Sequence, residues 1–257
     1  VTGVQTCALP ISSFTRMVDL VMRQTGGLAG RRLNDSGRSI LMSLALSQVK
    51  EELVLYQKQS GSRELVELML SALKEFKMCG IRPEDLKAAA DRLEEGNLRK
   101  KIRETGLVMA AYEALVSQSY IDPLDDLTRL KNVLEVTPFF KGYTVMVDAF
   151  AGFTAQELEV LSLVLRQAKE TVISVCVDQD PAKDNGMGLF SPVKKTVRQL
   201  RRIAKDYHIP LAPSIRLPHG KRFQNEELKL LEQVIYRQER LESGEVPGHI
   251  VLYNASD

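Results

Sequence analysis

The chain has 257 residues, of which 44% are hydrophobic and 26% are charged, and these proportions are typical of a folded globular protein. Its 35 Lys and Arg residues nearly balance its 33 Asp and Glu residues, so the formal net charge is only +2. The composition excludes a disordered tail and a uniformly basic, histone-like protein. We expect no membrane-spanning helix, because the sequence contains no sufficiently long apolar stretch. Three cysteines are too few for a disulfide framework, which favours a reducing compartment.

Residues 1–11 carry no charge and follow neither a helical nor a strand period. They resemble the translation of a sequencing-library adapter read in frame, and we expect them to be no part of the natural protein. On this hypothesis Cys7 is irrelevant and the natural protein extends upstream. The alternative is a secretory signal, but the apolar run is short and no basic segment precedes it.

Helical patterns dominate the first half of the chain. Between residues 13 and 24 apolar side chains recur on one helical face, until Gly26 and Gly27 interrupt the pattern. The polar cluster 34–36 is a good cap for the next helix. Residues 34–136 are predicted to be almost wholly helical, with further helices starting near residues 65, 83, 97 and 123.

The pattern changes after Pro138. Two short β-rich runs, 144–147 and 171–177, each end at an acidic residue, Asp148 and Asp178. Apolar strands that alternate with helices are typical of a parallel sheet covered on both faces. We therefore predict an α/β fold, a parallel sheet with a large all-α insertion. The other predicted elements are helices over 154–169, 192–207 and 225–242 and strands over 209–217 and 249–253.

Asp148 and Asp178 are the first candidates for chemistry, because ligands bind beyond the carboxyl ends of parallel strands. A carboxylate in this place suits a Mg²⁺–nucleotide site. The alternative is that Asp simply ends strands and starts turns well. Glu157 is predicted to be structural, because Thr154 and Glu157 form a capping box. The sequence leaves the role of Gln156 open.

Other catalytic or metal signatures are missing from the sequence. Gly220 and Lys221 lack the earlier glycine of a phosphate-binding loop, since Ile215 stands there. The three histidines have no Cys or carboxylate at metal-ligand spacing. Cys79 and Cys176 are interpreted as ordinary small apolar residues. We expect neither a metal site nor a nucleophile–base pair in this chain.

The clearest electrostatic feature is the stretch 188–222, which holds nine basic residues and one acidic residue, Asp206. Within the predicted helix the basic positions fall on one face, as a phosphate backbone would require. A solvated helix face is the alternative, because charge runs usually have that role. The candidate DNA-binding residues of this helix are Lys194, Lys195, Arg198, Arg201, Arg202 and Lys205.

Several segments, taken in order, are similar to one known family. Residues 13–17 read SFTRM, residues 145–158 read VMVDAFAGFTAQEL and residues 189–192 read LFSP, and the basic helix and residues 222–232 follow. Together they resemble the B subunits of bacterial AddAB-type ATP-dependent helicase/deoxyribonucleases, which process broken DNA ends for recombination. The resemblance covers residues 12–257, and 145–158 is its most specific part.

The resemblance implies a superfamily 1 helicase scaffold. Residues 12–33 and 137–247 would form a truncated helicase-like core, 34–136 a helical insertion, and 248–257 the start of the next domain. In the family a phosphate-binding loop lies upstream of residue 12 and an iron–sulfur cluster lies with the nuclease near the C-terminus. Mg²⁺, ATP and that cluster are therefore implied for the full-length protein, and no cofactor is expected here.

Site roles also follow from the resemblance. Residues 13–17 align with the helicase motif that contacts a single strand, so Phe14 and Arg16 are the expected DNA contacts, with a core aromatic as the alternative for Phe14. Asp148 occupies the Walker B position, but Ala149 replaces the Glu that would orient the attacking water. We therefore expect a degenerate motor without catalytic residues in this chain, although the resemblance implies that the parent protein is a hydrolase.

The expected partners are single-stranded DNA, duplex DNA ends and the A subunit, which drives translocation and forms a heterodimer with its B counterpart. The expected location is the bacterial cytoplasm, with no membrane association. Two alternatives stay open. The chain could be part of an ATP-hydrolysing motor whose phosphate-binding loop was lost by truncation, or residues 34–136 could be a helical docking module for the A subunit.

Overall fold

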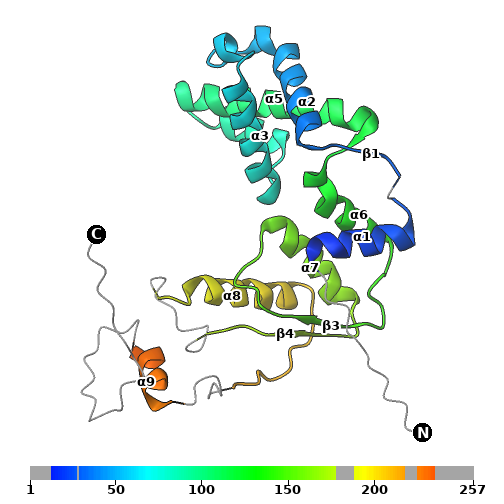
Figure 1. Ribbon diagram of the computed structural model, residues 1–257, viewed down its shortest axis with the longest axis vertical. Coiled ribbons are helices and arrows are strands. Elements are labelled where there is room, and N and C mark those ends of the chain that lie inside the picture. The colour runs from blue at the N-terminus through cyan, green and yellow to red at the C-terminus, as the bar shows by residue number, and fades with distance from the viewer. Residues whose placement is uncertain (1–12, 28, 178–187, 218–224, 235–257) are drawn as a thin grey trace. The chain divides into compact units, whose positions relative to one another are not determined.

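The computed structural model describes residues 13–27, 29–177, 188–217 and 225–234 (Figure 1). It divides the chain into two compact units, Val1–Cys176 and Val177–Asp257. The expected adapter segment 1–11, Asp178 and the predicted strand 249–253 lie outside the described residues.

The first described element of the first unit is α1, Phe14–Thr25. The Ser13 hydroxyl accepts a hydrogen bond from the Arg16 amide at 3.3 Å and so caps the helix. The buried face consists of Val18, Val21 and Met22, as the apolar pattern predicted. The helix ends at Gly26, whose φ of 80° lies in the left-handed region that favours glycine.

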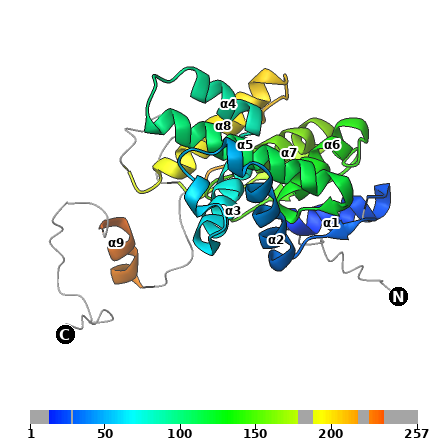
Figure 2. The same ribbon diagram turned by 90° about the horizontal axis from the view of Figure 1, so that it is seen from above.

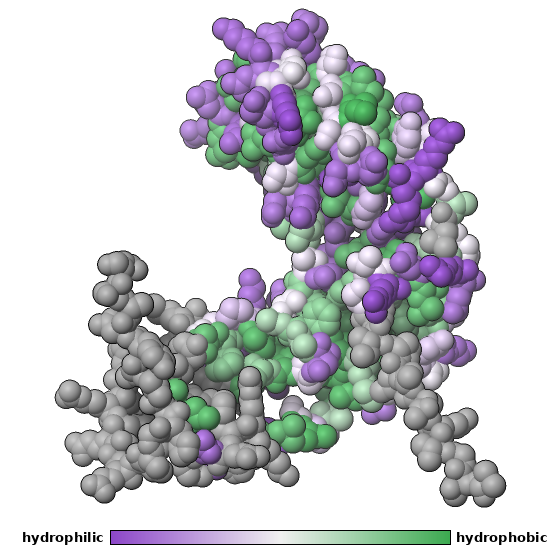
Figure 3. Space-filling model, in the orientation of Figure 1, coloured by the Kyte–Doolittle hydropathy of each residue, from purple (hydrophilic) through white to green (hydrophobic). Residues whose placement is uncertain are grey.

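Four helices form a bundle around one apolar core: α2 (Asp35–Gln48), α3 (Arg63–Met78), α4 (Pro83–Asp91) and α5 (Asn97–Ser119). Figures 1 and 2 show them gathered together, and Figure 3 shows polar side chains over much of the visible outer surface with apolar patches between them. Asn34 caps α2 as predicted, accepting from the Gly37 amide at 2.8 Å. The largest fully buried side chains of this core include Tyr112, Met42, Met69, Leu73 and Met109.

A buried carboxylate fixes the connection between α2 and α3, which contains two 3₁₀ turns, Lys50–Glu52 and Gln57–Gln59. Glu104 of α5 is 4% exposed and accepts hydrogen bonds from three successive backbone amides, those of residues 54–56, at 3.0–3.1 Å. Each of these amides would otherwise lack a partner in this turn, so the carboxylate replaces secondary structure as their acceptor.

The chain enters and leaves the bundle through a pair of two-residue parallel strands, β1 (Arg31–Arg32) and β2 (Tyr120–Ile121). The Leu33 amide extends the ladder to the Ile121 carbonyl at 2.9 Å. Beyond β2, a 3₁₀ turn (η3, Pro123–Asp125) leads into α6 (Asp126–Val136), which packs against α1 and α7. These strands were not predicted from the sequence, because two residues are too few to show a strand period.

The parallel pairing predicted for the runs 144–147 and 171–177 is confirmed, but the second strand is shorter than predicted, because residues 174–177 form no strand. β3 (Thr144–Val147) runs parallel to β4 (Glu170–Ile173), and α7 (Ala155–Gln167) connects them. The register pairs Val145 with Thr171 and Val147 with Ile173. The predicted capping box also forms at the start of α7.

In the second unit the structure describes α8 (Ser191–Asp206) and α9 (Glu226–Val234). The strand predicted over 209–217 is wrong, because no strand forms there. Pro210 and Pro213 lack the amide hydrogens that a ladder needs, and Ile215 is 90% exposed. The described part of the chain is mostly helical with two short parallel strand pairs, which agrees broadly with an α/β fold. None of its helices is both long and apolar enough to cross a membrane.

Candidate nucleic-acid interface

Helix α8 has one cationic face and one buried face. Pro192 stands in its first turn, where the missing amide hydrogen does no harm. Leu200 and Ala204 are 9% and 4% exposed, and they mark the buried side. The surface-exposed basic residues form what we call the α8 cation row: Lys195, Arg198, Arg201, Arg202 and Lys205.

Lys194 differs from the other candidates. Its spacing to Arg198 and Arg201 places it at the N-terminal end of the same row, yet it is only 5% exposed. The sequence period alone did not predict this burial. The row that a nucleic acid could reach therefore consists of the five exposed residues.

The charge of the row is not balanced within its own helix. The only acidic residue of α8 is Asp206, at the C-terminal end. Neighbours four residues apart, such as Arg198 and Arg202, are about 6 Å apart along the helix axis. A string of cations at this spacing attracts anions and can follow a phosphate backbone.

The first turn of α1 contains both residues predicted as DNA contacts in this segment, but on different sides of the helix. The Arg16 side chain is on the exposed face of the helix. Phe14 is half-buried, and its ring meets Phe150 and Phe153 edge-on, with centroid distances of 5.9 and 6.2 Å. These two rings belong to the loop between β3 and α7, so α1 and that loop are in direct contact.

Asp148, the predicted Walker B position, lies directly after β3 and is exposed. It accepts a hydrogen bond from the hydroxyl of Ser174, which follows β4. The next residue, Ala149, has a φ of 64°, which is uncommon for a residue other than glycine. The two strand ends are therefore adjacent, as the parallel pairing predicted.

The two neighbouring polar residues of α7 have structural roles. Glu157 accepts a hydrogen bond from the Thr154 amide at 2.8 Å, and the Glu157 amide donates to the Thr154 hydroxyl at 3.2 Å, so the predicted capping box is confirmed. The Gln156 side chain, to which the sequence assigned no role, is 9% exposed and donates to the Thr128 hydroxyl at 3.3 Å. It holds α7 against α6.

The described residues do not form a metal centre. No group of three His, Cys, Asp or Glu side chains with metal-binding geometry occurs among them. Cys79 and Cys176 are both free and exposed, so their interpretation as small apolar packing residues is wrong: Cys79 caps the end of α3 and Cys176 follows β4. Two cysteines in separate elements do not fit an iron–sulfur cluster, which needs four ligands. Asp148 offers one carboxylate for a hydrated Mg²⁺.

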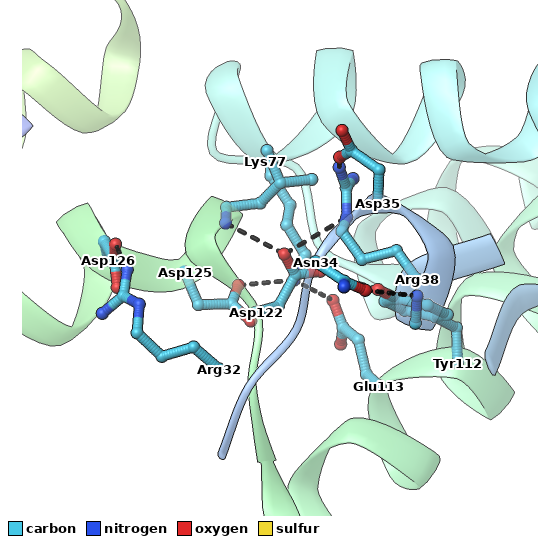
Figure 4. A network of polar contacts seen from close by, with 12 residues as sticks. Arg32, Asn34, Asp35, Arg38, Lys77, Tyr112, Glu113, Asp122, Asp125 and Asp126 are labelled. Atoms are coloured by element: carbon cyan, nitrogen blue, oxygen red, sulfur yellow. Dashed lines mark hydrogen bonds and ion pairs between the residues drawn. The ribbon is translucent and has the colours of Figure 1, made fainter. Parts of the chain in front are cut away.

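A network of charged residues lies where the bundle meets α6, and no sequence pattern indicated it (Figure 4). At its centre the Asp122 side chain is fully buried. Its carboxylate accepts from the Tyr112 hydroxyl at 2.8 Å and the Leu124 amide at 3.0 Å, and it lies 3.4 Å from Nε of Arg38. Burial, reinforced by the Asp122 charge, raises the pKa of Tyr112.

Two further acids of the same turn bind other elements. Asp125 pairs with Lys77 of α3, and Lys77 also lies 3.8 Å from Glu113 of α5. Asp126 pairs with Arg32 of β1. Burial raises the pKa values of Glu113 and Asp125, although Lys77 opposes the shift. We call these residues the junction network: Arg32, Arg38, Lys77, Tyr112, Glu113, Asp122, Asp125 and Asp126.

Comparison with known protein families shows to which family this chain belongs. A family model described as "ADDB, N-terminal" matches residues 4–232, which include α1, the bundle, the Asp148 segment and α8. The chain belongs to the AddB N-terminal family. This confirms the predicted resemblance. The match begins within residues 1–11, and the expectation that this segment is an adapter stays a prediction.

Several curated relatives of this AddB-family chain are named as the B subunit of an "ATP-dependent helicase/deoxyribonuclease". The relative from Thermoanaerobacter sp. (strain X514) is 31% identical over 229 residues, 88% of this chain and 20% of the relative. The protein of the same name from Clostridium botulinum (strain Loch Maree / Type A3) is 31% identical over 241 residues, 91% of this chain and 21% of the relative. The AddB-family chain thus spans about a fifth of the length of these relatives.

Proposed function

We propose that this chain is the DNA-binding, helicase-like part of the AddB component of an ATP-dependent helicase/nuclease that processes double-strand DNA ends. The observation that supports this most directly is the α8 cation row, whose residues Lys195, Arg198, Arg201, Arg202 and Lys205 are all exposed. The names of the curated relatives support an assembly with more than one subunit. In such an assembly the A subunit would be the partner that drives translocation.

Phosphate binding follows from the charge of this row. Each cation that neutralises a phosphate releases condensed counterions, and this release favours binding at low salt. Lys194 is buried and contributes to the field of the helix without direct contact. The start of α1, where Arg16 is exposed, is the second proposed contact point for a single strand.

The segment around Asp148 is proposed to lack efficient ATP hydrolysis. Phosphoryl transfer to water needs a group that orients the attacking water, and Ala149 supplies none beside Asp148. Glu157 cannot take this role from its present position, because its carboxylate binds the Thr154 amide.

A second candidate function is a docking site for the A subunit on the helical bundle. A groove of about 610 Å³ lies between α2 and α3, lined in part by Ser36, Ser39 and Ser43. Ile40 and Leu44 border it and are 61% and 48% exposed. These two exposed apolar side chains are the observation that favours a docking role, because contiguous apolar surface marks protein contacts. Co-purification of the A subunit with and without residues 34–136 would test this role.

Single-stranded DNA binding, titrated across salt, tests the DNA-binding proposal. The test variant changes Arg198, Arg201, Arg202 and Lys205 to Ala. Because each phosphate contact on a single strand adds about 0.7 to the log–log salt slope, loss of all four should flatten it by about 3. Affinity should fall at every salt concentration.

A matched control removes the same charge elsewhere. Lys87, Lys100, Lys101 and Arg103 are exposed on α4 and α5, and their change to Ala also removes four positive charges. We expect this control to keep most of the slope. If both variants bind alike, the effect is one of net charge, and the α8 cation row is a solvated face.

A further inference from the structure

Three phenylalanines form a compact group in the first unit, which we call the aromatic triad: Phe14, Phe150 and Phe153. Phe150 and Phe153 stack with a centroid distance of 5.0 Å and an interplanar angle of 25°. Phe14 meets both rings at steep angles, 78° and 80°. Edge-to-face and offset-stacked pairs are the favoured arrangements of aromatic rings, so the group is a specific packing unit.

The triad joins segments far apart in the sequence. Phe14 is the first residue of α1, and its partners lie in the loop between β3 and α7. The core contacts of α1 are made further along, by Val18, Val21 and Met22. The first turn of α1 is held instead through the Phe14 ring, and Arg16 belongs to that turn.

The loop is itself held in an unusual conformation. Ala149, beside Phe150, has a φ of 64°, and a residue with a side chain adopts this value only where its surroundings enforce it. The Ser174 hydroxyl binds Asp148 on one side of Ala149, and the stacked rings follow on the other. The loop therefore offers Phe14 a fixed surface.

We propose that Phe150 and Phe153 are positioning residues for DNA binding by α1. They hold the edge-on ring of Phe14 and so fix the direction in which Arg16 leaves the helix. Arg16 contacts the phosphate, and Phe14 anchors the turn; its ring packs on protein and does not stack on a base. This inference rests on the proposed function, because it assumes that the start of α1 contacts a single strand.

A double-mutant cycle on the full chain tests the coupling. Arg16→Ala should weaken single-stranded DNA binding by up to about fivefold, as an exposed ion pair supplies. It should also lower the salt slope by about 0.7. Phe150→Leu with Phe153→Leu should produce the same two changes, because the misdirected Arg16 no longer meets its phosphate. The triple variant should bind no more weakly than Arg16→Ala alone.

Two controls separate positioning from general destabilisation. Phe150→Tyr with Phe153→Tyr keeps the rings and should bind as the wild type does. Phe139→Leu makes the same chemical change in another aromatic group and should leave the salt slope unchanged.

The possible results distinguish the inference from the function on which it rests. If Arg16→Ala weakens binding while the two Leu changes do not, or if their losses add, the positioning role is overturned. If Arg16→Ala binds as the wild type does, the α1 contact itself is overturned, and the inference falls with it. The α8 variant reports separately on the cation row.

Discussion

Asp122→Ala should be among the most destabilising single substitutions in the first unit. The carboxylate is fully buried and serves three partners: the Tyr112 hydroxyl, the Leu124 amide and the guanidinium of Arg38. Its removal leaves the buried hydroxyl without an acceptor, which costs about 1–3 kcal/mol, and breaks a buried ion pair, which costs about 3–5 kcal/mol. Arg38 keeps a weaker contact with Asp35 at 3.7 Å, so we take the lower end of each range and expect a loss of about 4 kcal/mol.

Thermal and urea unfolding, followed by circular dichroism, would measure this loss. For a chain of this size about 4 kcal/mol corresponds to a fall in Tm of about 12 °C. Asp122→Asn keeps an acceptor for the hydroxyl and the amide, so it should be milder. Tyr112→Phe combined with Asp122→Ala should cost less than the sum of the single changes, because the two groups share one hydrogen bond.

The matched control is Glu67→Ala, which breaks the exposed pair between Arg63 and Glu67. Their side chains are 86% and 61% exposed, so its loss should stay below about 0.5 kcal/mol. An Asp122→Ala variant no less stable than this control would show that the junction network does not hold the bundle to α6, and the reasoning from burial would be refuted.

Two further predictions concern the same unit. Burial raises the pKa of Glu113, so the folded state binds the Glu113 proton more tightly than the unfolded state does. The stability that this carboxyl contributes therefore declines as the pH rises from the ordinary pKa of 4.5 through the raised value. In urea unfolding, the free energy of unfolding of Glu113→Gln should therefore rise relative to that of the wild type between about pH 4 and pH 7, while Asp125 still pairs with Lys77. The same difference between variant and wild type at both pH values would contradict this. Ala149→Gly should leave the free energy of unfolding unchanged or raise it by up to about 1 kcal/mol, because glycine accepts a positive φ freely. Thermal unfolding would measure this, and a lower Tm for the variant would argue against backbone strain at Ala149.

Local signals in the sequence predicted most of the elements correctly. Asn34 and Thr154 predicted where their helices start, because capping depends on residues only three positions apart. The parallel pair was predicted from two short β-rich runs, 144–147 and 171–177, although the second forms a strand only over Glu170–Ile173. These features need no knowledge of distant segments.

Features that depend on distant segments could not be predicted. Burial of Lys194 contradicts its place in the helical period, and only tertiary packing decides it. Asp122 has the appearance of a helix cap in sequence, yet its partners Tyr112 and Arg38 come from two other helices. The strand predicted over 209–217 does not form, because the apolar residues there are exposed and alternate with prolines that cannot join a strand ladder.

The two strand pairs of the first unit share one topology. β3, α7 and β4 form the usual arrangement, in which a single helix returns the chain to the start of a parallel neighbour. β1 and β2 are also parallel, and what returns the chain between them is the entire bundle of α2–α5. A parallel pair requires a crossover but sets no upper limit on its length. The bundle is thus an enlarged crossover, and helices could be gained or lost within it while Arg32 and Ile121 keep their register.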